Sequence, residues 1–200
     1  MVRIKICCIQ NLKEAKLAIN FGINSLGFVS EMPSGPGIIS LEQIRRIVKN
    51  IPPYISTSLL TSKNNFDDIS RQLLKTNTNT IQIVDKVDTE VYLDLKKYFP
   101  YIKIIQVIHV LSEKDIDESL ETEKYVDAFL LDSGNPNLKV KKLGGTGKIH
   151  DWNISRRIRE KVKKPIILAG GLNSDNVSLA IKMISPYALM YVQVLELMIY

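Results

Sequence analysis

The chain has 200 residues, 45% hydrophobic and 24% charged, a size and balance that fit one domain, residues 1–200, and exclude a disordered chain. No apolar run nears the roughly 18 residues that cross a bilayer, and the start MVRIKICCIQ is unlike a secretory signal, so we expect a cytoplasmic protein without membrane contact. The net charge of +6 is mostly lysine without a groove-reading motif, which argues against a nucleic-acid partner and suits an anionic small substrate.

Short β-rich runs alternate with segments of helical period along the whole chain. Asn11 with Glu14 and Ser40 with Gln43 form helix-start patterns, the second ending at Pro52,. Further helices are expected after Ser112, Asp151 and Ser174. The runs are β-branched and nearly all apolar, as in parallel strands covered on both faces; they are residues 3–7, 25–29, 55–60, 80–83, 102–108, 126–131 and 166–169.

Seven strand–helix units, with room for an eighth strand near Tyr187, fit either a closed (β/α)₈ TIM barrel or an open doubly wound sheet. The dinucleotide-binding fingerprint of the open sheet is absent, because Gly35-Pro36-Gly37 runs into Ser40 where a glycine or alanine is needed,. The pattern therefore predicts an α/β (β/α)₈ barrel, incomplete at its eighth βα unit.

Active sites of such barrels lie at the C-terminal ends of the strands. Cys7 ends the first predicted strand, Asp132 ends the sixth, and Gly170-Gly171 ends the seventh. Asp132 is the more telling of the first two, because a carboxylate closing an apolar strand is costly unless it is paired or functional. A cysteine is often a small core residue, and that alternative stands for Cys7.

The segment between the sixth strand and the next helix, residues 133–150, is far longer than the usual βα connection,. It contains Gly144-Gly145-Thr146-Gly147-Lys148, a glycine cluster beside a lysine that favours a lid approaching an anion. It is not a nucleotide P-loop, because Lys142 stands where that motif needs glycine and Ile149 where it needs serine or threonine.

Five segments together resemble phosphoribosylanthranilate isomerases in order and spacing, over roughly residues 2–190. They are KICCIQ (5–10), INSLGFV (23–29), DAFLLDS (127–133), LGGTGKIHDW (143–152) and LAGGLNSDNV (168–177). The resemblance implies an Amadori rearrangement of N-(5′-phosphoribosyl)anthranilate in tryptophan biosynthesis, with a phosphosugar substrate, no cofactor and no metal. It leaves the oligomeric state open.

By the same resemblance Asp132 is the acid that opens the ribose ring and Cys7 is the base that removes the C2 proton. The acid needs a raised pKa, which burial supplies, and the base must be a thiolate, which nearby positive charge favours. Lys5 shares a strand face with Cys7 and is either the source of that charge or the partner of a buried acid.

The substrate- and phosphate-binding residues implied are Gly144, Gly145, Gly147, Lys148, Gly170 and Gly171. For Gly170 and Gly171 the alternative is a plain turn into the next helix, but backbone N–H groups near a helix start also suit a phosphate.

The chain departs from the family pattern in four places. Residues 32–37 carry no cation where the family has an arginine that holds the anthranilate carboxylate, and Gln82-Ile83-Val84-Asp85 replaces Gln-Leu-His-Gly. Cys8 stands where the family has glycine, and we interpret it as a packing residue. From Met190 onward the chain lacks the expected Ser-Gly-Val phosphate loop and closing helix.

We expect this tail to result from a reading-frame shift. One permitted codon choice for residues 189–200, read two bases later, encodes YVCSGVRTNDL, which contains Ser-Gly-Val; sequencing the coding DNA tests this. A truncated form would have weak or no activity. The alternatives are therefore an inactive paralogue that binds a phosphorylated ligand or a partner, and a related aldose–ketose isomerase with another substrate.

Overall fold

The computed structural model of the chain describes residues 2–192, in which strands and helices alternate. The strands are β1 (Arg3–Cys7), β2 (Ser25–Val29), β3 (Ser56–Thr61), β4 (Thr80–Ile83), β5 (Lys103–His109), β6 (Ala128–Asp132), β7 (Ile166–Leu168) and β8 (Ala188–Val192). The helices are α1 (Leu12–Asn20), α2 (Leu41–Val48), α3 (Phe66–Thr76), α4 (Thr89–Tyr98), α5 (Lys114–Thr122), α6 (Trp152–Lys161) and α7 (Val177–Ile184), with a 3₁₀ turn at Glu123–Tyr125.

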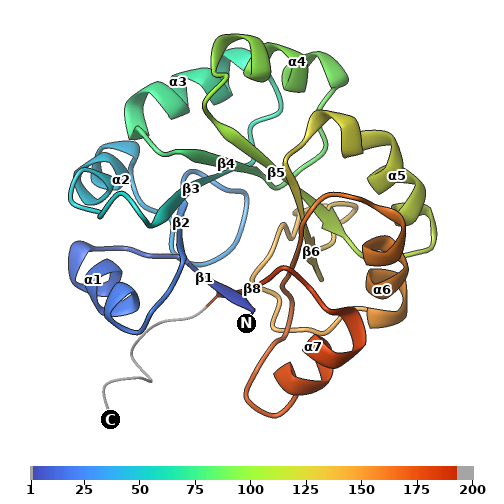
Figure 1. Cartoon of the computed structure of the whole chain (residues 1–200). Coiled ribbons are helices and arrows are strands. Elements are labelled where there is room, and N and C mark those ends of the chain that lie inside the picture. The colour runs from blue at the N-terminus through green and yellow to red at the C-terminus, as the bar shows by residue number, and fades with distance from the viewer. Residues whose placement is uncertain (1, 193–200) are drawn as a thin grey trace.

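All eight strands are parallel and form a closed barrel in sequence order. β8 closes it by pairing with β1 along the whole strand, from Arg3 opposite Ala188 to Cys7 opposite Val192. The helices lie outside the strands (Figure 1). The predicted (β/α)₈ barrel is confirmed, including the eighth strand after Tyr187.

The predicted helix starts at Asn11 and Ser40 are confirmed by their hydrogen bonds. Asn11 Oδ1 accepts from the Glu14 N–H at 2.9 Å, and Ser40 Oγ accepts from the Gln43 N–H at 3.1 Å. The second helix ends before the predicted Pro52, at Val48, because the N–H groups of the next turn bond three residues back rather than four,. The last helix starts at Val177, with Asn176 as its N-cap rather than Ser174.

Two apolar layers result from the alternation of side chains along each strand. One lies between strands and helices and includes Leu26, Phe28, Leu59 and Phe129. The other fills the barrel; its members include Leu60, Val84, Ile105, Leu130, Ile167 and Met190. The barrel is therefore a packed core, and its chemistry is confined to the mouth.

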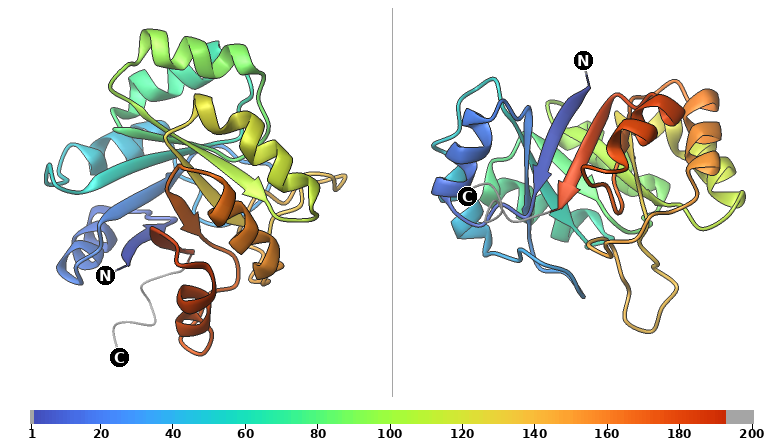
Figure 2. Two further views of the ribbon diagram at one scale, coloured as in Figure 1. Left: turned by 45° about the vertical axis from the view of Figure 1, so that its right-hand side comes forward. Right: turned by 90° about the horizontal axis from the view of Figure 1, so that it is seen from below.

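The longest loops extend from the C-terminal ends of the strands (Figure 2). They are residues 30–40 between β2 and α2, and residues 133–151 between β6 and α6. No helix within residues 2–192 is long and apolar enough to cross a membrane. Of the tail predicted to be frameshifted, residues 190–192 form the end of β8, and the rest lies outside the described residues.

Candidate active site

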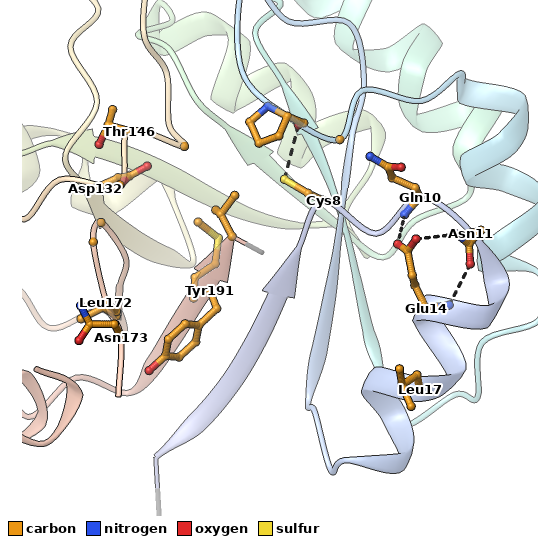
Figure 3. Close-up of a pocket in the computed structure, with 18 of the residues that line it drawn as sticks. Cys8, Gln10, Asn11, Glu14, Leu17, Asp132, Thr146, Leu172, Asn173 and Tyr191 are labelled. Carbon is orange, nitrogen blue, oxygen red and sulfur yellow. Dashed lines mark hydrogen bonds between the residues drawn. The ribbon is translucent and has the colours of Figure 1, made fainter. Parts of the chain in front are cut away.

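A cleft of about 850 Å³ opens at the C-terminal ends of the strands. Figure 3 shows Asp132 and Thr146 on one side and Cys8 on the other, with Tyr191 of β8 between them. A second, smaller cavity of about 40 Å³ lies beside it, and Asp132, Cys8 and Met190 line both. Cys7 lines only the smaller cavity.

Cys7 is the last residue of β1 and is 2% exposed. Its sulfur lies against β2 at Gly27, where an added Cβ would come within 2.9 Å of Sγ. The pKa of the Cys7 thiol is lowered to about 7, first by hydrogen bonding from Cys8 and next by the charge of Lys5, while burial opposes both. A substantial fraction of Cys7 is therefore thiolate at neutral pH.

Cys8 has a backbone φ of +65°, in the left-handed region that side chains other than glycine rarely adopt,. Its thiol has one proton and two acceptors in reach, the Pro36 carbonyl at 3.5 Å and the Cys7 sulfur. The Cys7 thiolate is the stronger acceptor because it is charged. Proximity to Cys7 and burial raise the pKa of Cys8, so Cys8 stays protonated. It lies in the walls of both cavities as well as packing against the core.

Asp132 is the last residue of β6 and is 4% exposed. Its Oδ1 accepts from the Ser133 N–H at 2.7 Å, and Oδ2 lies 3.1 Å from where a Cβ on Gly144 would stand. Burial raises the pKa of Asp132, although the Ser133 N–H and the neighbouring His109 oppose it. This environment favours the protonated carboxyl, which is the direction that a general acid requires.

Lys5 lies inside the barrel, 2% exposed. Its ammonium donates to Gln82 Oε1 at 2.5 Å and to Met190 Sδ at 3.4 Å. Burial lowers the pKa of Lys5, and the charge of Cys7 raises it. Of the two roles expected from the sequence, these contacts support a source of positive charge beside Cys7 rather than a partner of a buried acid.

The glycine-rich segments meet at one end of the larger cleft. Gly145, Gly147, Gly170 and Gly171 line it together with Thr146 and Asn173, while Gly144 lines the smaller cavity. Lys148 is exposed and lines neither cavity. Of the six residues predicted to bind substrate or phosphate, Lys148 alone is thus not brought to either wall.

Close backbone packing explains the glycines after β7. Gly170 and Gly171 have φ of +81° and +63°, and a Cβ on Gly171 would lie 2.7–2.8 Å from the backbone of Lys148 and Ile149. Ser133 Oγ and Thr146 Oγ1 are 2.6 Å apart and join the start of the loop to its glycine cluster. The Gly170-Gly171 turn therefore packs directly against the end of the β6–α6 loop.

The loops after β2 and β6 contact each other over Cys7. Ser34 Oγ donates to the Lys141 carbonyl at 2.7 Å, and a Cβ on Gly145 would lie 2.9 Å from Pro36 Cδ. The Gly35-Pro36-Gly37 segment bends at Pro36, and both of its glycines have positive φ. The ammonium of Lys141 pairs with Asp85.

His150, at the end of the β6–α6 loop, is held by Ser155, whose Oγ is 2.7 Å from Nε2. Burial lowers the pKa of His150 to about 4, so its ring is neutral at pH 7. Within the described part of the chain, no group of histidine, cysteine and acidic residues is arranged to hold a metal ion.

Sequence reasoning missed several residues of the walls, chiefly Gln82, Met190, Thr146 and Asn173. Thr146 lies inside the glycine cluster, so the motif itself could have indicated it. Gln82 is a polar residue in an apolar strand, which is a usable signal because buried polar groups need partners. Met190 and Asn173 carry no such signal.

Comparison with known proteins gives one consistent family. The profile described as N-(5'phosphoribosyl)anthranilate (PRA) isomerase matches residues 4–192. The N-(5'-phosphoribosyl)anthranilate isomerase 2 of Methanosarcina mazei is 36% identical over 187 residues, covering 93% of this chain and 82% of that protein. The isomerase of Methanocaldococcus jannaschii is 32% identical over 200 residues, covering 94% and 86%.

Solved structures agree. A phosphoribosyl anthranilate isomerase in complex with reduced 1-(o-carboxyphenylamino)-1-deoxyribulose 5-phosphate superposes with a TM-score of 0.79 at 26% identity, covering 98% of this chain and 89% of that one. The isomerase of Thermotoga maritima gives a TM-score of 0.79 at 29% identity, covering 95% and 87%.

Proposed function

This chain belongs to the N-(5'-phosphoribosyl)anthranilate isomerase family, and from that membership we propose that Cys7 and Asp132 are its catalytic base and acid. The protein is an isomerase of tryptophan biosynthesis. One observation carries the assignment: a thiol with a lowered pKa and a carboxyl with a raised pKa line the same cavity at the strand ends. Opposite shifts in a pair of titratable groups are what acid–base catalysis at one pH requires.

The reaction proceeds by proton transfers, and we assign the first two to Asp132 and Cys7. Asp132 donates its proton to the ribose ring oxygen, the C1–O bond breaks, and the anthranilate nitrogen lone pair forms the C1=N bond of a Schiff base. The Cys7 thiolate then takes the proton from C2; the C2–H electron pair forms the C1=C2 bond as the second pair of C1=N returns to nitrogen, which gives an enolamine. Loss of the C2 hydroxyl proton and protonation at C1 complete the aminoketose. Each role matches the protonation state that burial and neighbours favour,.

Different parts of the substrate occupy the two cavities. The phosphate lies at the glycine end of the larger cleft, where Gly145–Gly147 and Gly170–Asn173 meet, because backbone N–H groups beside a helix start favour an anion. The reacting carbons lie beside Asp132, which lines both cavities. The aromatic ring enters the smaller one, whose walls include Val29, Leu60, Val84 and Leu143.

The smaller cavity, at about 40 Å³, is close to the space of a single water and too small for an aromatic ring,. Substrate entry therefore requires the loops after β2 and β6 to separate. The contacts that must open are the Ser34–Lys141 hydrogen bond and the packing of Pro36 against Gly145.

Turnover of phosphoribosylanthranilate, followed as loss of its fluorescence, tests this function. Cys7→Ala and Asp132→Asn should each lower kcat by roughly 10²–10⁴-fold, because each removes one general catalyst, while the affinity for a product analogue changes little. Cys8→Ala removes the thiol that contributes most to the lowered pKa of Cys7, so it should lower kcat near pH 7 and recover as the pH rises, whereas Cys7→Ala should not recover at any pH. Full turnover by Cys7→Ala would refute the base assignment, and ligand binding without any turnover by the parent chain would favour the inactive paralogue.

A further inference from the structure

Lys5 presents an energetic problem that the mechanism above does not address. Its side chain is buried inside the barrel, and its two hydrogen-bond acceptors, Gln82 Oε1 and Met190 Sδ, carry no charge. An ammonium removed from water is strongly unfavourable unless a counter-charge lies nearby. Lys5 therefore either gives up its proton, the direction in which burial moves its pKa, or keeps it beside a group in the barrel that supplies a counter-charge,.

The geometry indicates Cys7. The same point above Gly27, where a Cβ would stand, is 2.9 Å from Cys7 Sγ and 3.1 Å from Lys5 Nζ. The two atoms are therefore at most about 6 Å apart, a separation at which opposite charges stabilise each other's ionised form,. The absence of a side chain at Gly27 makes this approach possible, because any Cβ there would displace one of the two groups.

The neighbouring strands present no competing counter-ion at this level. β8 places Met190 beside Lys5 and β2 places Ser25 there, and Gln82 reaches it from β4. The titratable groups that act on Lys5 are the thiols of Cys7 and Cys8. Asp132 acts on Cys7 rather than on Lys5. Cys8 keeps its proton, so the Cys7 thiolate is the negative charge available.

We propose that Lys5 is the fixed counter-ion that maintains Cys7 as a thiolate, and that Gln82 and Met190 hold the lysine in place below it. Two N–H groups of the ammonium donate to Gln82 and Met190 and fix it within about 6 Å of the Cys7 sulfur, so Lys5 acts on Cys7 through its charge. Lys5 lines neither cavity, so it is a positioning residue that acts through Cys7. This proposal rests on the assignment of Cys7 as the base.

The test measures the ionisation of Cys7 directly. Iodoacetamide alkylation is followed against pH in a Cys8→Ala background, which leaves one cysteine. Loss of the Cys8 hydrogen bond itself raises the midpoint of the profile, so every variant is compared with Cys8→Ala alone. The midpoint is read because it does not depend on access to the thiol. Lys5→Met keeps a long side chain and removes the charge. We expect the midpoint of Lys5→Met to lie at higher pH than that of the background. The ratio of its alkylation rate at pH 7 to its own rate at high pH should be about tenfold lower than the same ratio in the background.

Gln82→Glu is a second variant that leaves Lys5 intact. A carboxylate at this position pairs with the ammonium and weakens its effect on the thiolate, so the midpoint should again move up, even if Lys5→Met fails to fold. Lys103→Met is the control for net charge, because Lys103 lies at the outer end of β5 with its side chain 66% exposed; its midpoint should not move.

An unchanged midpoint in Lys5→Met, or in Gln82→Glu, would overturn the proposal and leave Lys5 a purely structural residue. Alkylation requires no turnover, so this result is independent of whether the chain isomerises phosphoribosylanthranilate. In an active enzyme Lys5→Met should also lower kcat near pH 7 and move the acidic limb of the pH–rate profile upward, with little change in KM.

Discussion

Cys8 and Gly37 should be energetically coupled. Gly37 has a φ of +77°, and a Cβ placed on it would lie 2.5 Å from Cys8 Cβ and 2.9 Å from Cys8 Cα. Gly37→Ala should cost about 2–5 kcal/mol of stability, from roughly 1–2 for the left-handed backbone and about 1–3 for overpacking. A Cys8→Gly background removes the clash with the cysteine side chain and leaves only the clash with its backbone. The same substitution should therefore cost less there, with a coupling of about 1–3 kcal/mol.

Urea unfolding of the parent, the two single variants and the double variant measures this coupling. Gly35→Ala is the matched control, because Gly35 also has a positive φ, of +115°, but nothing lies within 4 Å of its Cβ position. Its cost should be the same in the parent chain and in the Cys8→Gly background. If the Gly37 cycle gave a coupling within about 0.5 kcal/mol of zero, the level expected of independent sites, the steric argument would be wrong.

Three further predictions concern activity and the cleft wall. Cys7, the proposed base, must be deprotonated to act, and its pKa is about 7, so kcat/KM should fall about tenfold per pH unit below that value; a flat profile from pH 5 to 7 would contradict this. Gly171→Ala should lose about 2–5 kcal/mol in urea unfolding, since its Cβ would meet loop backbone at 2.7–2.8 Å with a φ of +63°,. Residues 32–37 carry no cation, so the KM for phosphoribosylanthranilate should agree within about threefold with that for phosphoribosylaniline, which lacks the carboxylate. A KM tenfold lower for phosphoribosylanthranilate would show that a cation elsewhere, such as Lys141, binds the carboxylate.

The strands were the most predictable part of the fold. Residues 3–7, 25–29 and 80–83 were predicted with the bounds that the structure has, and the other four predicted strands differ by one or two residues at their ends. Parallel strands covered on both faces are nearly all apolar, a signal that is local in sequence. Helix ends were less predictable, because tight turns such as the one after Val48 depend on how the chain meets its neighbours.

The site residues at the strand ends were predictable from the sequence, whereas those in the cavity walls were not. Strand ends indicated Cys7, Asp132 and the Gly170-Gly171 pair, because a barrel brings these ends to one mouth. Cys8, which stands where the family has glycine, was interpreted as a packing residue. It has a backbone φ of +65° and lies in the wall of the cleft. Lys148, predicted from a motif, lies outside both cavities.

The sequence by itself determined the barrel, the family and the order of the chemistry-bearing residues along the strands, because these follow from periodicity and from motifs within short segments. Only the tertiary structure decided which groups act on one another. Lys5 lies beside Cys7, held by Gln82 and Met190 from strands 77 and 185 residues away, and Asp132 lies across the mouth from β1. Ionisation depends on burial and on charges a few ångströms away, and those distances are set by closure of the barrel rather than by any local pattern.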